Sequence, residues 1–105
     1  MAQMELAGNV YKVDERGFLQ EPDKWSEDIA RAYALKEGVK ELTADHWTVI
    51  NYLRNYYLRT GICPMIQRLL KDTGFTIEQI YDLFPGGPAN SACKWSGIPK
   101  PTGCV

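Results

Sequence analysis

Hydrophobic residues recur every three to four positions in four segments of the chain, a spacing typical of helices that pack one face on a core. Residues that favour helix ends flank these segments. Ser26, Thr43 and Thr76 are suited to cap helix starts, and Gly38, Gly61 and Gly74 are suited to end helices. The sequence therefore predicts a helix between Ser26 and Gly38, a long helix over 44–59, a third over 64–72 and a fourth over 77–84.

A short alternating segment precedes these helices. Asn9–Val13 has the pattern of a β-strand, residues 14–17 are turn-forming, and Phe18 and Leu19 can pair back onto the strand. Two strands are marginally stable alone, so this hairpin must pack against the helices. We therefore expect a mostly helical α+β fold. It is a small helical bundle with a helix-turn-helix-like pair, an N-terminal β-hairpin and a flexible C-terminal arm.

The arm is predicted from composition. Residues 85–105 hold four of the nine glycines and four of the six prolines, and they contain no Asp or Glu. A segment of this composition cannot form a long regular element. Residues 1–84 carry ten basic and thirteen acidic residues, so the body is acidic. The chain thus divides into a globular domain over 1–84 and a cysteine-bearing arm over 85–105.

The whole-chain averages exclude several classes of protein. A length of 105 residues, a formal net charge of −1 and 45% hydrophobic residues indicate one small soluble domain. No apolar run is long enough for membrane insertion, and the first ten residues lack the features of a secretory signal. The near-neutral charge excludes a bulk polyanion binder. The odd number of cysteines, three, argues against a disulfide framework and favours a cytoplasmic protein.

Two of the three cysteines, Cys93 and Cys104, lie in the predicted arm, and Cys104 stands next to Val105 at the end of the sequence. Such a thiol is either an accidental exposed cysteine or a mobile redox or carrier group. A thiolate attacks electrophilic sulfur, and a second thiol can resolve the adduct by forming a disulfide. Cys93 and Cys104 are therefore the candidate reactive pair.

Other residues of the arm suit this chemistry. Its prolines favour an extended reach, and Gly103 lets the backbone beside Cys104 approach a narrow site closely. Lys94 and Lys100, with no acid nearby, favour the thiolate forms of the cysteines. Trp95 needs an apolar surface to cover, either on the domain or on a partner. Candidates for binding the docked arm or its terminal carboxylate are Arg54, Arg59, Arg68 and Lys71.

Cys63 lies at the start of the third predicted helix. A helix N-terminus can lower a thiol pKa, but a buried cysteine that acts as a small hydrophobic residue is the simpler interpretation. His46 and the three cysteines are the residue types of a Cys₃His zinc site, yet their spacing matches no zinc motif. We expect no metal or cofactor to be bound by this chain.

The third and fourth predicted helices, joined around Gly74, resemble a helix-turn-helix. The alternative function is therefore a small DNA-binding regulator with a redox-sensing cysteine pair. The candidate recognition helix carries Glu78 and Asp82 and no Lys or Arg. Phosphate repulsion at these carboxylates argues against nucleic-acid binding.

Several segments together resemble the DsrC family, the gamma subunit of dissimilatory sulfite reductase, and the related TusE sulfur-relay proteins. They are the ending 94–105 with Cys93 before it, the GFL hairpin, the WTVINYLRNYY helix and GICP at 61–64. In this family the functional pair is a penultimate cysteine and a second cysteine eleven positions earlier, which Cys104 and Cys93 match. TusE-like members generally lack the earlier cysteine, so the chain resembles DsrC proper.

The resemblance implies a sulfur carrier and co-substrate rather than an independent catalyst. Its arm would insert between the large subunits of dissimilatory sulfite reductase, where Cys104 would take up partly reduced sulfur from siroheme. Cys93 would then complete a trisulfide or disulfide, which a membrane thiol–disulfide oxidoreductase complex would reduce. The siroheme and the iron–sulfur clusters would belong to the reductase and not to this chain.

Overall fold

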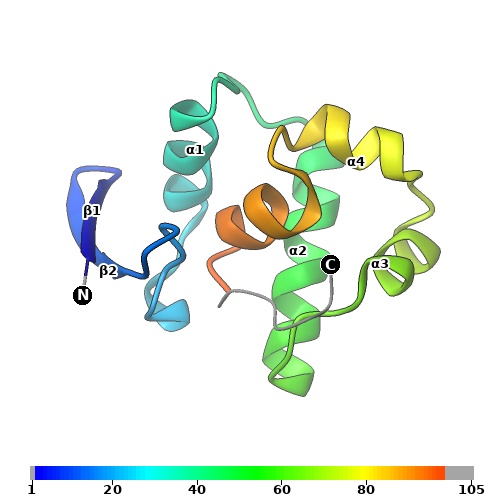
Figure 1. The fold of residues 1–105 in the computed structure, drawn as a ribbon, viewed down its shortest axis with the longest axis horizontal. Coiled ribbons are helices and arrows are strands. Elements are labelled where there is room, and N and C mark those ends of the chain that lie inside the picture. Colours follow the sequence, from blue (N-terminus) through cyan, green and yellow to red (C-terminus); the bar gives the residue numbers. More distant parts are fainter. Residues whose placement is uncertain (1, 99–105) are drawn as a thin grey trace.

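The structure, a computed structural model, describes residues 2–98 and has the expected α+β architecture. The long helix α2 runs through the middle of the molecule, with α1 and the β-hairpin on one side and α3 and α4 on the other (Figure 1). None of the helices in this part of the chain is long and apolar enough to cross a membrane. The elements are β1 (Ala2–Leu6), β2 (Asn9–Val13), the 3₁₀ segment η1 (Pro22–Lys24), α1 (Glu27–Lys36), α2 (Ala44–Thr60), α3 (Ile66–Thr73), α4 (Ile77–Leu83) and the π-helical η2 (Pro88–Cys93).

The hairpin differs from the prediction in its partner strand. The strand β2 pairs antiparallel with β1, and the register Leu6↔Asn9 leaves Ala7 and Gly8 as a two-residue turn. The predicted pairing of Leu19 with the strand is confirmed as an isolated antiparallel bridge to Val13, next to backbone hydrogen bonds from Gln20 to Lys12 and from Asp14 to Phe18. The main partner of β2 is β1, which was not predicted. The first strand was missed because its turn is Ala-Gly, which lacks the Asn-Gly or Asp-Gly sequence that marks hairpins.

The helix ends follow local chemistry closely. Thr43 and Thr76 each form a capping box with the third helical residue, and Gly61 and Gly74 end α2 and α3 in the left-handed conformation. The third helix starts at Ile66 and not at Pro64, because Met65 is still extended and its carbonyl accepts the first helical hydrogen bonds. The predicted helices were thus confirmed, with ends that shift by one or two residues.

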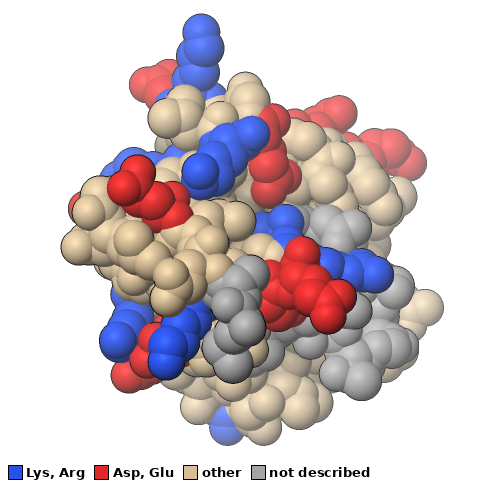
Figure 2. Space-filling view, turned by 60° about the vertical axis from the view of Figure 1, so that its left-hand side comes forward, with Lys and Arg blue, Asp and Glu red and all other residues tan. Residues whose placement is uncertain are grey.

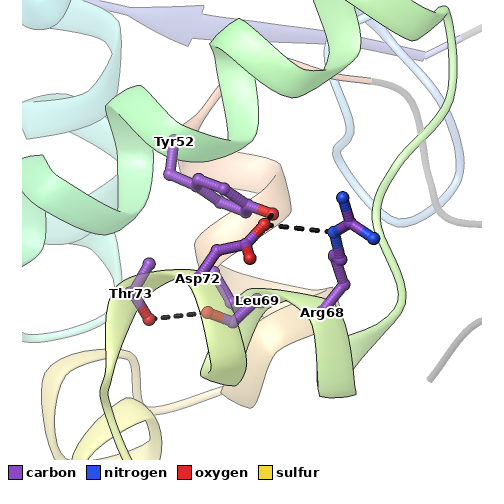
Figure 3. A network of polar contacts seen from close by, with 5 residues as sticks. All are labelled: Tyr52, Arg68, Leu69, Asp72 and Thr73. Atoms are coloured by element: carbon purple, nitrogen blue, oxygen red, sulfur yellow. Dashed lines mark hydrogen bonds and ion pairs between the residues drawn. The ribbon is translucent and has the colours of Figure 1, made fainter.

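A polar contact fixes α3 against α2 (Figure 3). The Tyr52 hydroxyl donates to Asp72 at 2.6 Å, and Arg68 Nε donates to the same carboxylate oxygen at 3.1 Å. Burial raises the pKa of Tyr52 to about 12, with a further contribution from Asp72, and the hydrogen bond from Tyr52 lowers the pKa of Asp72. This contact holds the two helices that flank the connection carrying Cys63.

Residues 85–98, which composition assigned to an arm, pack into the core instead. This segment crosses α2 between α1 and α4 (Figure 1, orange). Trp95 and Ile98 are fully buried, as is Ala92. Gly and Pro prevented a long helix, yet η2 and the turn after it suffice to insert these side chains. The expectation of an arm can therefore apply only after Ile98, and residues 99–105 lie outside the described residues.

Candidate functional site

Cys93 stands at the end of η2 and is 3% exposed. Its Sγ lies 3.2 Å from Sγ of Cys63, which is half-buried in the connection between α2 and α3. Cys63 Sγ also lies 3.5 Å from the carbonyl oxygen of Pro64. As expected of a small structural hydrophobic residue, Cys63 packs against the core. No local pattern predicts that its sulfur would contact that of Cys93, thirty residues away.

Four further residues were predicted to take part in the chemistry of the arm, and three of them lie close to the C-terminus. Cys104, Lys100 and Gly103 lie outside the described residues, so their roles stay predictions. Lys94 is described, and its ammonium group lies over the ring of Phe18, 5.5 Å from the ring centre. That contact attaches the end of η2 to the turn after β2.

Glu37, just after α1, holds the segment that carries Cys93. Its carboxylate accepts hydrogen bonds from the Ser91 hydroxyl and from the Trp95 indole N–H. The Ser91 hydroxyl in turn accepts from the Gly86 N–H at 2.7 Å. Sequence reasoning missed Glu37, because a carboxylate at a helix end is usually solvated and its partners here are more than fifty residues away.

The sequence left open whether Trp95 covers the domain or a partner, and in the structure it packs on the domain. Its indole stacks on His46 at 6.2 Å and packs against Phe84 at 5.0 Å. His46 Nδ1 accepts from the Thr43 N–H, so Nε2 carries the proton and donates to the Leu83 carbonyl at 2.7 Å. Both ring nitrogens of His46 are therefore engaged within the fold.

A second anchor holds the chain just before the described part ends. Trp25 Nε1 donates to the Trp95 carbonyl at 2.7 Å, and Gly97 lies against the Trp25 ring. Arg54 Nη1 donates to the Ser96 carbonyl at 2.8 Å while its guanidinium stacks over Trp25 at 4.3 Å. Burial lowers the pKa of Arg54, which nevertheless remains a cation at neutral pH.

Of the four cations considered for binding the arm, Arg54 contacts the C-terminal segment within residues 2–98. Arg68 binds Asp72, and Arg59 lies over the ring of Tyr56. Arg54 therefore acts at the base of the predicted arm, on the Ser96 carbonyl.

The helix-turn-helix-like pair is present as α3 and α4, but α4 exposes Glu78 and Asp82 as the sequence indicated. On the face drawn in Figure 2, acidic and basic side chains are interspersed, and neither sign forms a continuous patch. Among residues 2–98, no three His, Cys, Asp or Glu side chains gather in a group that could hold a metal ion.

Comparisons with known proteins agree in pointing to one family. The family model described as "DsrC like protein" matches residues 5–105. The gamma subunit of dissimilatory-type sulfite reductase from Nitratidesulfovibrio vulgaris is 43% identical, with all of both chains covered. The sulfurtransferase TusE of Salmonella paratyphi A is 40% identical over 93% of this chain and 95% of its own. In a crystal structure of dissimilatory sulfite reductase I, one chain is 46% identical and superimposes with a TM-score of 0.89, covering 99% of this chain and 100% of that one.

Proposed function

Because the chain belongs to the DsrC family, we propose that it is a gamma-subunit-type sulfur carrier of a dissimilatory sulfite reductase, with Cys104 and Cys93 as its reactive pair. It acts as a co-substrate of the large subunits, takes sulfur from them on Cys104, and delivers it to a membrane thiol–disulfide oxidoreductase complex. The chain itself carries no siroheme or iron–sulfur cluster in this proposal.

The observation that carries the proposal is the contrast between the two cysteines. Cys93 is held in the core by the anchors at Glu37, Trp25 and Arg54. Cys104 follows Ile98, the last described residue and a fully buried one, by six positions. Six extended residues span about 20 Å, enough to enter a partner while the domain stays outside. In this proposal one thiol is fixed in the domain and the other is carried on the short segment that follows.

Two thiols supply the electrons that this sulfur transfer requires. A sulfur atom two electrons more oxidised than elemental sulfur accepts one electron from each thiolate as it forms the trisulfide Cys93–S–Cys104. Reduction of the trisulfide by two electrons releases sulfide and leaves the Cys93–Cys104 disulfide, and two further electrons restore both thiols. Cys93 is 3% exposed, so the terminal residues must return to the domain before the trisulfide can close.

Intact-mass measurement after incubation with the reductase and sulfite tests this function. Cys104→Ala should abolish sulfur uptake, whereas Cys93→Ala should still take up sulfur on Cys104 but form no product that links two cysteines. Trypsin cleaves after Lys94 and so places Cys93 and Cys104 on different peptides, which makes the link directly visible. Sulfur uptake by the Cys104→Ala variant would contradict the proposal.

A further inference from the structure

The contact between Cys63 and Cys93 has no part in the chemistry above. Their sulfur atoms are 3.2 Å apart, and a disulfide bond of about 2.05 Å requires them to approach by only about 1.2 Å. We propose that Cys63 is a third redox cysteine, whose thiolate displaces Cys104 from Cys93 by thiol–disulfide exchange and forms a Cys63–Cys93 disulfide.

The backbone on both sides of the contact is anchored. On the side of Cys93, the Glu37 carboxylate binds Ser91, and Ser96 N–H and hydroxyl both donate to the Ala92 carbonyl. On the side of Cys63, Gly61 ends α2 and the Tyr52–Asp72 contact fixes α3 against α2. Two sulfurs held together in this way react as an intramolecular pair, with a large gain over thiols that must first meet.

The exposure of the two residues and of their neighbours assigns their roles. Cys63 is half-buried, and its neighbours Ile62 and Met65 are 61% and 57% exposed, so solvent reaches this connection. Cys93 is 3% exposed. A base in solution can therefore remove the thiol proton of Cys63, which makes Cys63 the attacking group and Cys93 the sulfur that is attacked.

The exchange step is balanced without an external oxidant. Cys63 first gives its proton to solvent, and its thiolate attacks Sγ of Cys93 in the Cys93–Cys104 disulfide. The Cys63–Cys93 bond forms, the Cys93–Cys104 bond breaks, and Cys104 leaves as a thiolate that takes a proton from solvent. The supply of the Cys93–Cys104 disulfide rests on the proposed function, but the ability of Cys63 and Cys93 to form a bond does not. The exchange frees Cys104 while the oxidising equivalents stay in the domain.

Oxidation of the Cys104→Ser variant with glutathione disulfide tests the bond by itself. Trypsin separates the cysteines onto peptides 60–68, 72–94 and 95–105. We expect the main product under non-reducing conditions to join 60–68 with 72–94, and to form at least tenfold faster in native protein than in urea. Glutathione adducts or unmodified thiols as the main products, or equal rates in urea, would overturn the inference.

The matched control is Cys63→Ser combined with Cys104→Ser, which should give no cross-linked peptide. If Cys63→Ser lowers the helix content, Cys63→Ala replaces it, because Cys63 packs against the core. In the wild-type chain, the Cys93–Cys104 link should appear first and the Cys63–Cys93 link should grow at its expense. With Cys63→Ser the first link should persist.

These measurements separate the two proposals. If the proposed function is wrong, the wild-type chain takes up no sulfur with the reductase, while Cys104→Ser still forms the Cys63–Cys93 disulfide. If Cys63 has no redox role, the wild-type chain takes up sulfur normally, but no link between peptides 60–68 and 72–94 forms in any variant.

Discussion

Gly97 lies directly beneath the indole of Trp25, so closely that a Cβ at position 97 would stand 2.2 Å from Cδ1 of the ring. Gly97 also has φ = +71°, a left-handed conformation that costs other residues about 1–2 kcal/mol. Sterics and backbone conformation therefore both require glycine at the base of the predicted arm.

Gly97→Ala should lower the free energy of unfolding by about 2–4 kcal/mol. The change adds backbone strain and displaces Trp25, which then loses its hydrogen bond to the Trp95 carbonyl. Urea unfolding followed by circular dichroism measures the loss. The control is Gly74→Ala, at φ = +79° with nothing within 4 Å of the added methyl, which should cost only about 1 kcal/mol. Equal losses in the two variants would refute the role of the Trp25 contact.

Arg54→Met should loosen the same anchor by another route. It removes the charged hydrogen bond to the Ser96 carbonyl and the stacking on Trp25, together worth about 2–3 kcal/mol. Hydrogen exchange should accelerate at the Ser96 and Gly97 amides and remain slow at the middle of α1. Arg31→Met, which removes a cation whose side chain is 54% exposed, should leave the exchange rates unchanged at Ser96 and Gly97 and in the middle of α1. Unaltered exchange at Ser96 would show that Arg54 does not anchor this segment.

Ala7→Asn should raise the free energy of unfolding by about 0.5–1 kcal/mol. Ala7 has φ = +53° in the two-residue hairpin turn, where asparagine is tolerated far better than alanine. Leu6 and Val13, at 1% and 2% exposure, connect the hairpin to the core, so the gain should appear in global unfolding. Gly8→Ala, at φ = +84°, should have the opposite sign. Destabilisation by Ala7→Asn would mean that the turn differs from the one described.

The Tyr52 phenol should lose its proton late. Burial, and then Asp72, raise its pKa from 10.0 to about 12. A raised pKa in the folded state means that the contact stabilises the fold fully below pH 10 and loses this contribution as the pH rises through about 12. NMR titration of ring-labelled tyrosine should show a partial fall of the Tyr52 pKa in Asp72→Asn.

Arg68→Met should shift the pKa of Tyr52 in the opposite direction. Arg68 lowers the pKa of Tyr52, so its removal should raise that pKa further. If both substitutions leave the titration of Tyr52 unchanged, the phenol is not bound to Asp72 in solution.

The parts of the fold that sequence predicted are those decided by neighbouring residues. Thr43 and Thr76 mark helix starts, and Gly61 and Gly74 mark helix ends, because each acts on backbone groups within four positions. The strand β1 was missed because its turn contains Ala7 at φ = +53°, where the sequence lacks the Asn or Gly that usually marks such a turn.

The site depends on contacts that no local pattern announces. The composition of residues 85–98 correctly excluded a long helix, but it could not show that Trp95 finds Glu37 and His46 more than forty residues away. The same holds for Cys63, whose contact with Cys93 comes from the way η2 crosses α2. The pairing of Cys93 with Cys104 rests on the family resemblance and stays a prediction.

The burial of Trp95 and Ile98 also constrains the order in which the chain folds during synthesis. A ribosome releases residues 2–84 first, with all four α-helices, but without the side chains that fill the space between α1, α2 and α4. Until Trp95 and Ile98 emerge, Phe84 and His46 lack the indole on which they pack. The nascent protein must therefore wait in a loosely packed state, and the segment that leads to the proposed reactive cysteine, Cys104, is also the one that fills this part of the core.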